Sequence, residues 1–247
     1  MLFFSESAYI EEVIATNSTV LVMWAFLALG LLTIISLKTK KLTALGKKLL
    51  FGSIVLVTLL PTLYLIVSTI QLNVISQSGG PVHWHADFEI WQCGQKLDLK
   101  DPTGFSNKIG TATFHEHNDD RMHVEGVVVE SSDVNLERFF TVIDGKLTAE
   151  TLTLPTTHGE VLMRNGDTCR DGTPGTLQVF VYQTDDDNYY TQQKLSDLGS
   201  YLLSPKSTVP SGDCIIVEFG EVKNRTDKLC RSYQAAEEIG KLKGERK

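Results

Sequence analysis

The sequence predicts an N-terminal two-helix transmembrane hairpin followed by a β-rich α+β extracytoplasmic domain. Three observations predict it. Two long uncharged apolar runs lie near the N-terminus, apolar and polar residues alternate after residue 80, and all four cysteines fall in that later part. A chain of 247 residues is long enough for one membrane module and one globular domain.

The apolar runs cover residues 19–37 and 49–75, and neither contains a charged residue. A membrane-spanning helix needs roughly 20 apolar residues. Both runs are therefore expected to cross a bilayer, the second with a tolerated proline at Pro61. A pair of buried helices is the alternative, which such long charge-free runs disfavour. A cleaved signal peptide is not expected either, because segment 1–18 is acidic and no small-residue cleavage site follows the first run.

Charge on either side of the runs predicts their orientation. The loop 38–48 carries five lysines, whereas segment 1–18 carries three glutamates and no Lys or Arg. The positive-inside rule places this loop in the cytoplasm. The N-terminal segment and everything after residue 76 are then extracytoplasmic, as in a two-pass cell-membrane protein. A linker 76–80, the domain 81–235 and a charged tail 236–247 complete the expected organisation.

Alternation within the domain predicts mostly strands. Residues 86–92 and 95–99 are expected to form a hairpin across Cys93-Gly94, and further strands are expected at 111–117, 122–130, 160–164, 176–184 and 214–219. Helical spacing predicts a helix over 134–143, capped by Ser132 or Asp133, and a short one over 195–203. The last segment, Ser232–Lys247, is helix-prone but strongly charged and is expected to fray.

The cysteines and the net charge limit the compartment and the partners. Two disulfides in an oxidising compartment fit four cysteines without Cys-x-x-Cys spacing. Three pairings are open, and we favour Cys214–Cys230 because it would tie the tail to the last strand. The formal net charge is −7 and no basic tract is present, so nucleic acid is not an expected partner.

Five of the six histidines lie between residues 81 and 130, four of them in two His-x-His pairs. Residues i and i+2 of a strand point to the same face, so each pair presents two imidazoles together. Neutral imidazole suits zinc, copper, iron or nickel. We therefore expect a site for a transition-metal ion, copper or zinc, formed by His83, His85, His115, His117, His123 and Glu125.

The loop after His117 decides on which face His123 lies. A four-residue loop, 118–121, would pair His117 with Met122 and send His123 to the opposite face. A five-residue loop, 118–122, pairs His117 with His123, and we favour it because it gathers the histidines and turns the neighbouring valines away. Glu125 then shares the face of His123, where it would ligate, orient a ring or act as a base.

Other side chains near these motifs have a plainer interpretation. Met122 and Met163 are soft ligands suited to copper(I), although methionines of this kind are usually core residues. Whether His158 joins the site is left open. The acidic residues of the same stretch are expected to be solvated strand and turn residues rather than ligands: Glu89, Glu116, Asp119 and Asp120.

Two resemblances follow from these motifs. His83-Trp-His85-Ala-Asp-Phe-Glu89 resembles the start of a cupin metal motif, although the expected later glycine is absent because Gly94 comes too early. The order HWHADFEIW, HEHNDDRMHVEG, NLERFF, TLQVFVYQ and CIIVEFGE, over residues 81–221, is similar to a group of uncharacterised, often membrane-anchored bacterial and archaeal proteins. Those proteins carry a His-rich HxH…HxH…HxE extracytoplasmic domain. The second resemblance implies a metal-binding fold and brings no substrate with it.

Three functions compete on these observations. The leading one is a membrane-anchored, extracytoplasmic copper- or zinc-binding domain that acts as an accessory subunit or metal-handling protein, with a membrane protein partner or as a homo-oligomer. The second is a metal-dependent enzyme with an open His-ligated position and Glu125 as general base. The third is a structural or pH-sensing membrane subunit without metal.

Overall fold

The structure is a computed structural model that describes residues 6–39, 41–103, 105, 107–203 and 212–246. The chain divides into two compact units, Met1–Gly80 and Pro81–Lys247, and we call the second unit the β domain. Residues 1–5 of the expected N-terminal segment, residue 40 of the basic loop and residue 247 of the tail lie outside the described residues.

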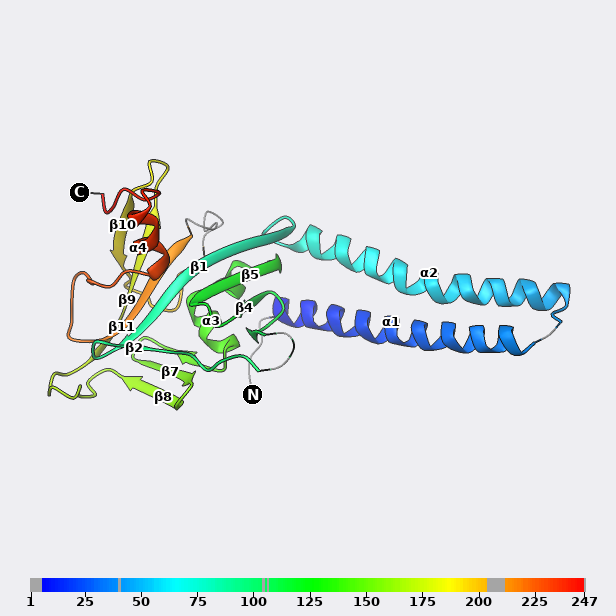
Figure 1. Ribbon diagram of the computed structural model, residues 1–247, viewed down its shortest axis with the longest axis horizontal. Helices are drawn as coiled ribbons and strands as arrows, with labels where there is room; N and C mark the ends of the chain where they lie inside the picture. The colour runs from blue at the N-terminus through cyan, green and yellow to red at the C-terminus, as the bar shows by residue number, and fades with distance from the viewer. Residues whose placement is uncertain (1–5, 40, 104, 106, 204–211, 247) are drawn as a thin grey trace. The chain divides into compact units, whose positions relative to one another are not determined.

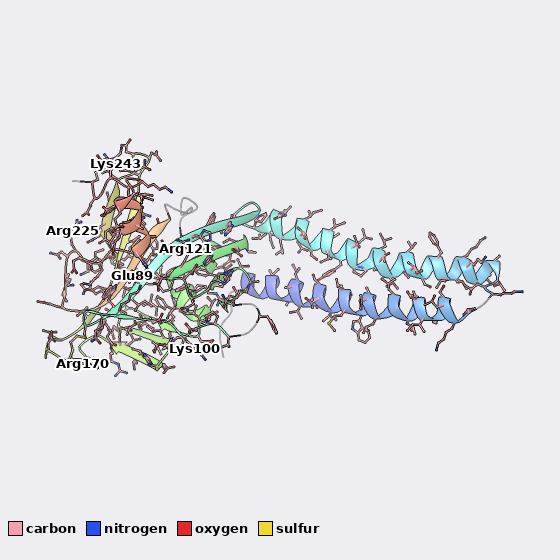
Figure 2. All side chains as sticks on the ribbon, in the orientation of Figure 1. Glu89, Lys100, Arg121, Arg170, Arg225 and Lys243 are labelled. Atoms are coloured by element: carbon pink, nitrogen blue, oxygen red, sulfur yellow. A yellow bond between two sulfur atoms is a disulfide. The ribbon has the colours of Figure 1, made fainter. Side chains whose placement is uncertain are left out.

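The first unit consists of two long apolar helices, as the sequence predicted. Helix α1 spans Glu6–Lys38 and helix α2 spans Ala44–Ile75, and most of the side chains drawn on them in Figure 2 project outward. Both contain stretches long and apolar enough to cross a membrane, Val13–Lys38 and Ala44–Ile75.

Both helices extend beyond the apolar runs themselves. Helix α1 begins thirteen positions before residue 19, within the segment expected to precede the membrane. Helix α2 starts early because the Thr43 side chain accepts a hydrogen bond from the Gly46 amide at 3.1 Å, which caps its first turn. Lys47 and Lys48, expected in the loop, therefore lie in the first turns of α2.

The β domain holds one large mixed sheet and one small antiparallel sheet (Figure 1). The large sheet has the order β10-β9-β11-β1-β5-β4-β3, with β2 paired to β1, and the small sheet has the order β6-β7-β8. The strands are β1 Pro81–Gln92, β2 Gln95–Leu97, β3 Ile109–Gly110, β4 Phe114–Glu116, β5 Arg121–Val127, β6 Lys146–Leu147, β7 Thr151–Thr156, β8 Gly159–Arg164, β9 Thr176–Thr184, β10 Tyr190–Lys194 and β11 Asp213–Gly220.

Strand β1 is the long central strand, parallel to β11 on one side and antiparallel to β5 on the other. It continues into the expected hairpin with β2, where Gln92 pairs with Gln95. Cys93 and Gly94 form the two-residue turn with φ values of 50° and 79°. Positive φ at both positions matches the right-handed twist of the flanking strands.

The two faces of the large sheet are covered differently. One face carries the main apolar core, in which Ala86, Phe88 and Ile90 of β1 pack with helix α3 (Leu136–Val142) and the small sheet. The other face packs near β9 and β10 against helix α4 (Arg231–Glu238), through Tyr233 and neighbouring apolar residues (Figure 1). On the β1, β5 and β4 part of this second face lie the histidines.

Two predictions about helices in the β domain were wrong. Helix α3 is capped by Asn135, whose side chain accepts from the Arg138 amide, while Ser132 and Asp133 lie in a separate 3-10 turn, Ser131–Val134. Residues 195–203 form no helix. Their carbonyl groups at Gly199 and Tyr201 instead accept the otherwise unpaired first amides of α3.

The charged tail is docked rather than frayed. Leu242 is buried beside α4, and the Arg246 amide donates to the Tyr190 carbonyl on strand β10. The Arg246 guanidinium binds Asp185 and Asp187 at 2.6 and 2.8 Å. These partners lie about sixty positions earlier in the chain, so the local sequence carried no sign of them.

The four cysteines form two disulfides, Cys93–Cys169 and Cys214–Cys230. The second is the favoured pairing, and it joins strand β11 to the residue before α4. Disulfides of this kind persist in oxidising compartments.

Candidate metal centre

Three histidines form a row across three neighbouring strands. His123 on β5 pairs directly with His85 on β1 and with His115 on β4. Adjacent strands lie about 4.8 Å apart, and the ring centroid of His123 lies 4.6 Å from that of His85 and 5.5 Å from that of His115. Pairing between segments that are distant in sequence therefore gathers the imidazoles on one face.

The neighbouring rows of the same face add further polar side chains. His83 on β1 pairs with Glu125 on β5, one step along from the histidine row. On the other side of that row, Asp87 pairs with Arg121, and their side chains form an ion pair at 2.5 Å (Arg121 is labelled in Figure 2). Because Asp87 compensates this guanidinium, the row beside the histidines adds little net charge.

His117 joins the cluster from just beyond the end of β4. Its ring centroid lies 4.7 Å from that of His115 and 4.8 Å from that of His123. The five histidines named from the sequence and Glu125 are thus brought together. His158 is not: it lies exposed in the turn between β7 and β8 and belongs to neither ligand group found among the described residues.

The loop between the two strands is shorter than either length considered. The register pairs His115 with His123, so only residues 118–120 separate His117 from the first residue of β5. The expected pairing of His117 with His123 is wrong. His123 nevertheless lies on the expected face, because the observed three-residue loop, like the favoured five-residue loop, has an odd number of residues. Asn118 and Asp120 adopt φ values of 64° and 57°, a left-handed conformation that Asn and Asp tolerate. These two residues were the available signal for a tight loop.

Two histidines are held in one tautomer by acceptors. His117 Nδ1 lies 2.6 Å from the Asn107 carbonyl oxygen, which can only accept, so Nδ1 carries the proton. His123 Nε2 lies 3.1 Å from Asp119 Oδ2 and donates to that carboxylate. Each ring keeps its other nitrogen as a lone-pair donor, the arrangement that orients metal-bound histidines in proteins. Asp119 was expected to be a solvated turn residue rather than a partner of His123, and Asn107 was not named from the sequence.

Burial favours the neutral form of His85, His115 and His123. The pKa of His115 is lowered to about 4 by burial, with a further contribution from Lys108, and the pKa of His85 is lowered to about 4 by burial and by His123. Burial also lowers the pKa of His123, against the opposing effect of Asp119. Neutral imidazoles at pH 7 have lone pairs available for a cation.

Two buried nitrogens of the cluster lack a hydrogen-bond partner among the described residues, Nδ1 of His115 and Nδ1 of His123. A buried polar atom without a partner is costly. A bound ion or a water molecule would relieve that cost, which is consistent with a ligand at this place.

The donor atoms form two overlapping groups: His83, His85, His123 and Glu125, and His115, His117 and His123. Within each group the donor atoms lie within 4.8 Å of one another. A tetrahedral ion with bonds near 2.1 Å needs donor separations of about 3.4 Å. Small side-chain rotations would close that difference, so the residues fit a first-row transition ion.

Glu125 belongs to the first group and also approaches His115 of the second. Its Oε1 is 3.1 Å from His83 Nε2 and its Oε2 is 3.8 Å from His115 Nε2. The side chain of Glu125 is 45% exposed, so it contacts both solvent and the histidines. Met122 and Met163, considered as soft ligands, are instead buried in the apolar core.

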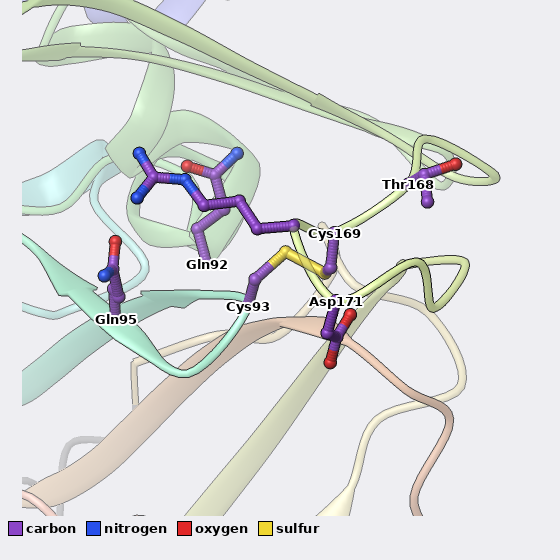
Figure 3. Close-up of a pocket in the computed structure, with 7 residues that line it drawn as sticks. Gln92, Cys93, Gln95, Thr168, Cys169 and Asp171 are labelled. Atoms are coloured by element: carbon purple, nitrogen blue, oxygen red, sulfur yellow. A yellow bond between two sulfur atoms is a disulfide. The ribbon is translucent and has the colours of Figure 1, made fainter.

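A hollow of about 410 Å³ lies at the far end of β1, next to the Cys93–Cys169 disulfide (Figure 3). It contains no histidine and is lined by Gln92, Cys93, Gln95, Thr168, Cys169, Arg170 and Asp171. The metal-ligand candidates lie at the opposite end of the strand, so this hollow and the histidine cluster are separate features.

Comparisons with protein-family models, with curated proteins and with solved structures found no match to this chain.

Proposed function

We propose that the β domain binds a copper or zinc ion through its histidine cluster and acts as a metal-handling domain. The cross-strand row His85–His123–His115 carries this proposal. The pairing of β5 with β1 and with β4 holds these three imidazoles side by side, although the three strands come from different parts of the sequence. The donor set is rich in nitrogen, which suits copper and zinc and does not suit magnesium or calcium.

The surroundings of the cluster support binding at neutral pH. Burial holds His85 and His115 neutral, and Asp119 and the Asn107 carbonyl fix two rings in defined tautomers. Glu125 stands at ligand distance within one donor group. That position favours a role in holding the ion over a role as a free general base.

We further propose that α1 and α2 anchor the domain in a membrane with the β domain on the extracytoplasmic side. The lengths and compositions of both helices support it. So do the lysines near the α1–α2 connection, by the positive-inside rule, and the two disulfides, by the oxidising compartment that they require.

Metal binding is tested with the full-length protein in detergent, without an affinity tag containing histidine. The metal-stripped protein is titrated with Zn²⁺ and with Cu²⁺ against a competing chelator. Loss of a group that only hydrogen-bonds to a metal ligand weakens metal binding by roughly 10–100-fold. His85→Ala removes a ligand itself, so it is expected to weaken binding by more than that. His158→Ala, which removes an exposed histidine outside the cluster, is expected to bind as the wild type does. Equal binding by both variants would refute the proposed site.

Orientation is tested by labelling intact cells with a membrane-impermeant maleimide. The native cysteines are paired in disulfides and do not react, so introduced cysteines report alone. Thr157→Cys, in an exposed turn of the β domain, is expected to be labelled at once. Thr39→Cys, in the α1–α2 connection, is expected to be labelled only after the cells are made permeable. The reverse pattern would overturn the orientation.

A further inference from the structure

The two ligand groups share one histidine. We call His83, His85 and Glu125 with His123 the outer position, and His115 and His117 with His123 the inner position. A neutral imidazole has one lone pair, and Asp119 holds one nitrogen of His123 as a hydrogen-bond donor. His123 can therefore complete only one of the two positions at a time.

The two positions differ in their exposure to solvent. The side chains of His83 and Glu125 are 64% and 45% exposed. The inner position is more enclosed, since the His115 side chain is 1% exposed and His117 is half-buried. An ion at the outer position thus remains near water, whereas an ion at the inner position gives up more of its hydration.

The two positions also differ in charge. The outer position contributes one carboxylate, from Glu125, and Arg121 beside it is paired with Asp87. The inner position contributes imidazoles alone, and the opposite charges of Lys108 and Glu125 both act on His115. The inner position therefore has no anionic ligand of its own to offset the charge of a bound cation.

Desolvation separates ions by charge at these positions. The cost of moving an ion out of water grows with the square of its charge, so a monovalent ion loses about a quarter of what a divalent ion of similar size loses. Cu⁺ also accepts three-coordinate binding, whereas Zn²⁺ is almost always bound by four ligands. Three imidazoles around the buried His115 suit the former, and three imidazoles with a carboxylate suit the latter.

We propose that the cluster is a one-ion, two-position site in which the charge of the ion selects the position: Zn²⁺ takes the outer position and Cu⁺ takes the inner position. The proposal rests on the metal-binding function proposed above and specifies it. Binding of either ion at its position excludes the other, because each needs the single lone pair of His123. No electron transfer is involved, since each ion is taken up in the oxidation state in which it is supplied.

The test uses the full-length protein in detergent and measures affinities for Zn²⁺ and, without oxygen, for Cu⁺, each against a chelator. His83→Ala is expected to weaken Zn²⁺ binding at least 10-fold and to leave Cu⁺ binding within about 3-fold. His117→Ala is expected to do the reverse, and the binding that each variant retains shows that it is folded. Glu125→Gln is expected to follow His83→Ala, and His123→Ala to weaken both ions.

A competition measurement completes the test. Cu⁺ added to the Zn²⁺-loaded wild type is expected to release one Zn²⁺ for each Cu⁺ bound. Simultaneous binding of both ions would overturn the two-position proposal while leaving metal binding intact. So would variants that rank in the same order by their loss of affinity for Zn²⁺ and for Cu⁺. Failure of the wild type to bind either ion would instead refute the proposed function itself.

Discussion

Replacing His115 with glutamine is expected to remove part of the acid sensitivity of the metal-free β domain. The pKa of His115 is about 4 in the folded protein, against an ordinary value of 6.5. Between these values the unfolded chain binds the proton and the folded chain does not. Folding stability from this residue is therefore fully present above about pH 6.5 and is lost as the pH falls toward 4. From about pH 8 to about pH 5 the loss amounts to about 2 kcal/mol.

The assay is urea unfolding in detergent with EDTA present, followed by tryptophan fluorescence, to which Trp84 and Trp91 of the β domain contribute together with Trp24 of α1. His115→Gln cannot take up a proton, so its free energy of unfolding should fall by about 2 kcal/mol less than that of the wild type over this pH interval. His158→Gln is the matched control, because His158 is exposed and outside the cluster. Equal pH dependence of the wild type and His115→Gln would refute the burial argument.

Two further predictions concern the frame around the cluster. The disulfide Cys93–Cys169 spans 76 residues and Cys214–Cys230 spans 16, so replacing the first pair with alanines should cost about 1.4 kcal/mol more than replacing the second. Urea unfolding of the two double variants checks this, and an equal or reversed order would contradict the chain-entropy account. Gly110→Ala would place a Cβ 2.5 Å from the Phe114 carbonyl oxygen, while Gly159→Ala has nearly the same φ and open space around it. Gly110→Ala should therefore be less stable by about 1–3 kcal/mol than Gly159→Ala. Equal stabilities in the same assay would contradict this, because they would mean that the backbone of the β3–β4 hairpin shifts to accommodate the added Cβ without a loss of stability.

The fold class was predictable because its signals are local. Uncharged runs of about 20 residues or more predicted the two helices, and the alternation of apolar and polar residues predicted most of the strands of the β domain. Alternation also placed His83 beside His85, because strand residues two apart share a face. The hairpin at Cys93 and Gly94 followed from the same local reasoning.

The arrangement of the site was less predictable because it depends on contacts distant in sequence. Placement of β5 between β1 and β4 makes His123 the middle of the row, and no periodicity in the chain indicates that order. The interactions of Asn107 with His117 and of Asp119 with His123 depend on how the loops close. The sequence named Glu125 as a candidate ligand, but its place in one donor group and its approach to His115 of the other required the register.

The central claim is tested most directly by the metal content of the full-length protein as isolated from membranes without a histidine tag. Elemental analysis should find close to one equivalent of copper or zinc in the wild type and in His158→Ala. It should find almost none in His123→Ala, which removes the residue shared by both donor groups. A metal-free wild type that stays metal-free after exposure to both ions, or equal metal in His123→Ala, would contradict the assignment of this cluster as a metal centre.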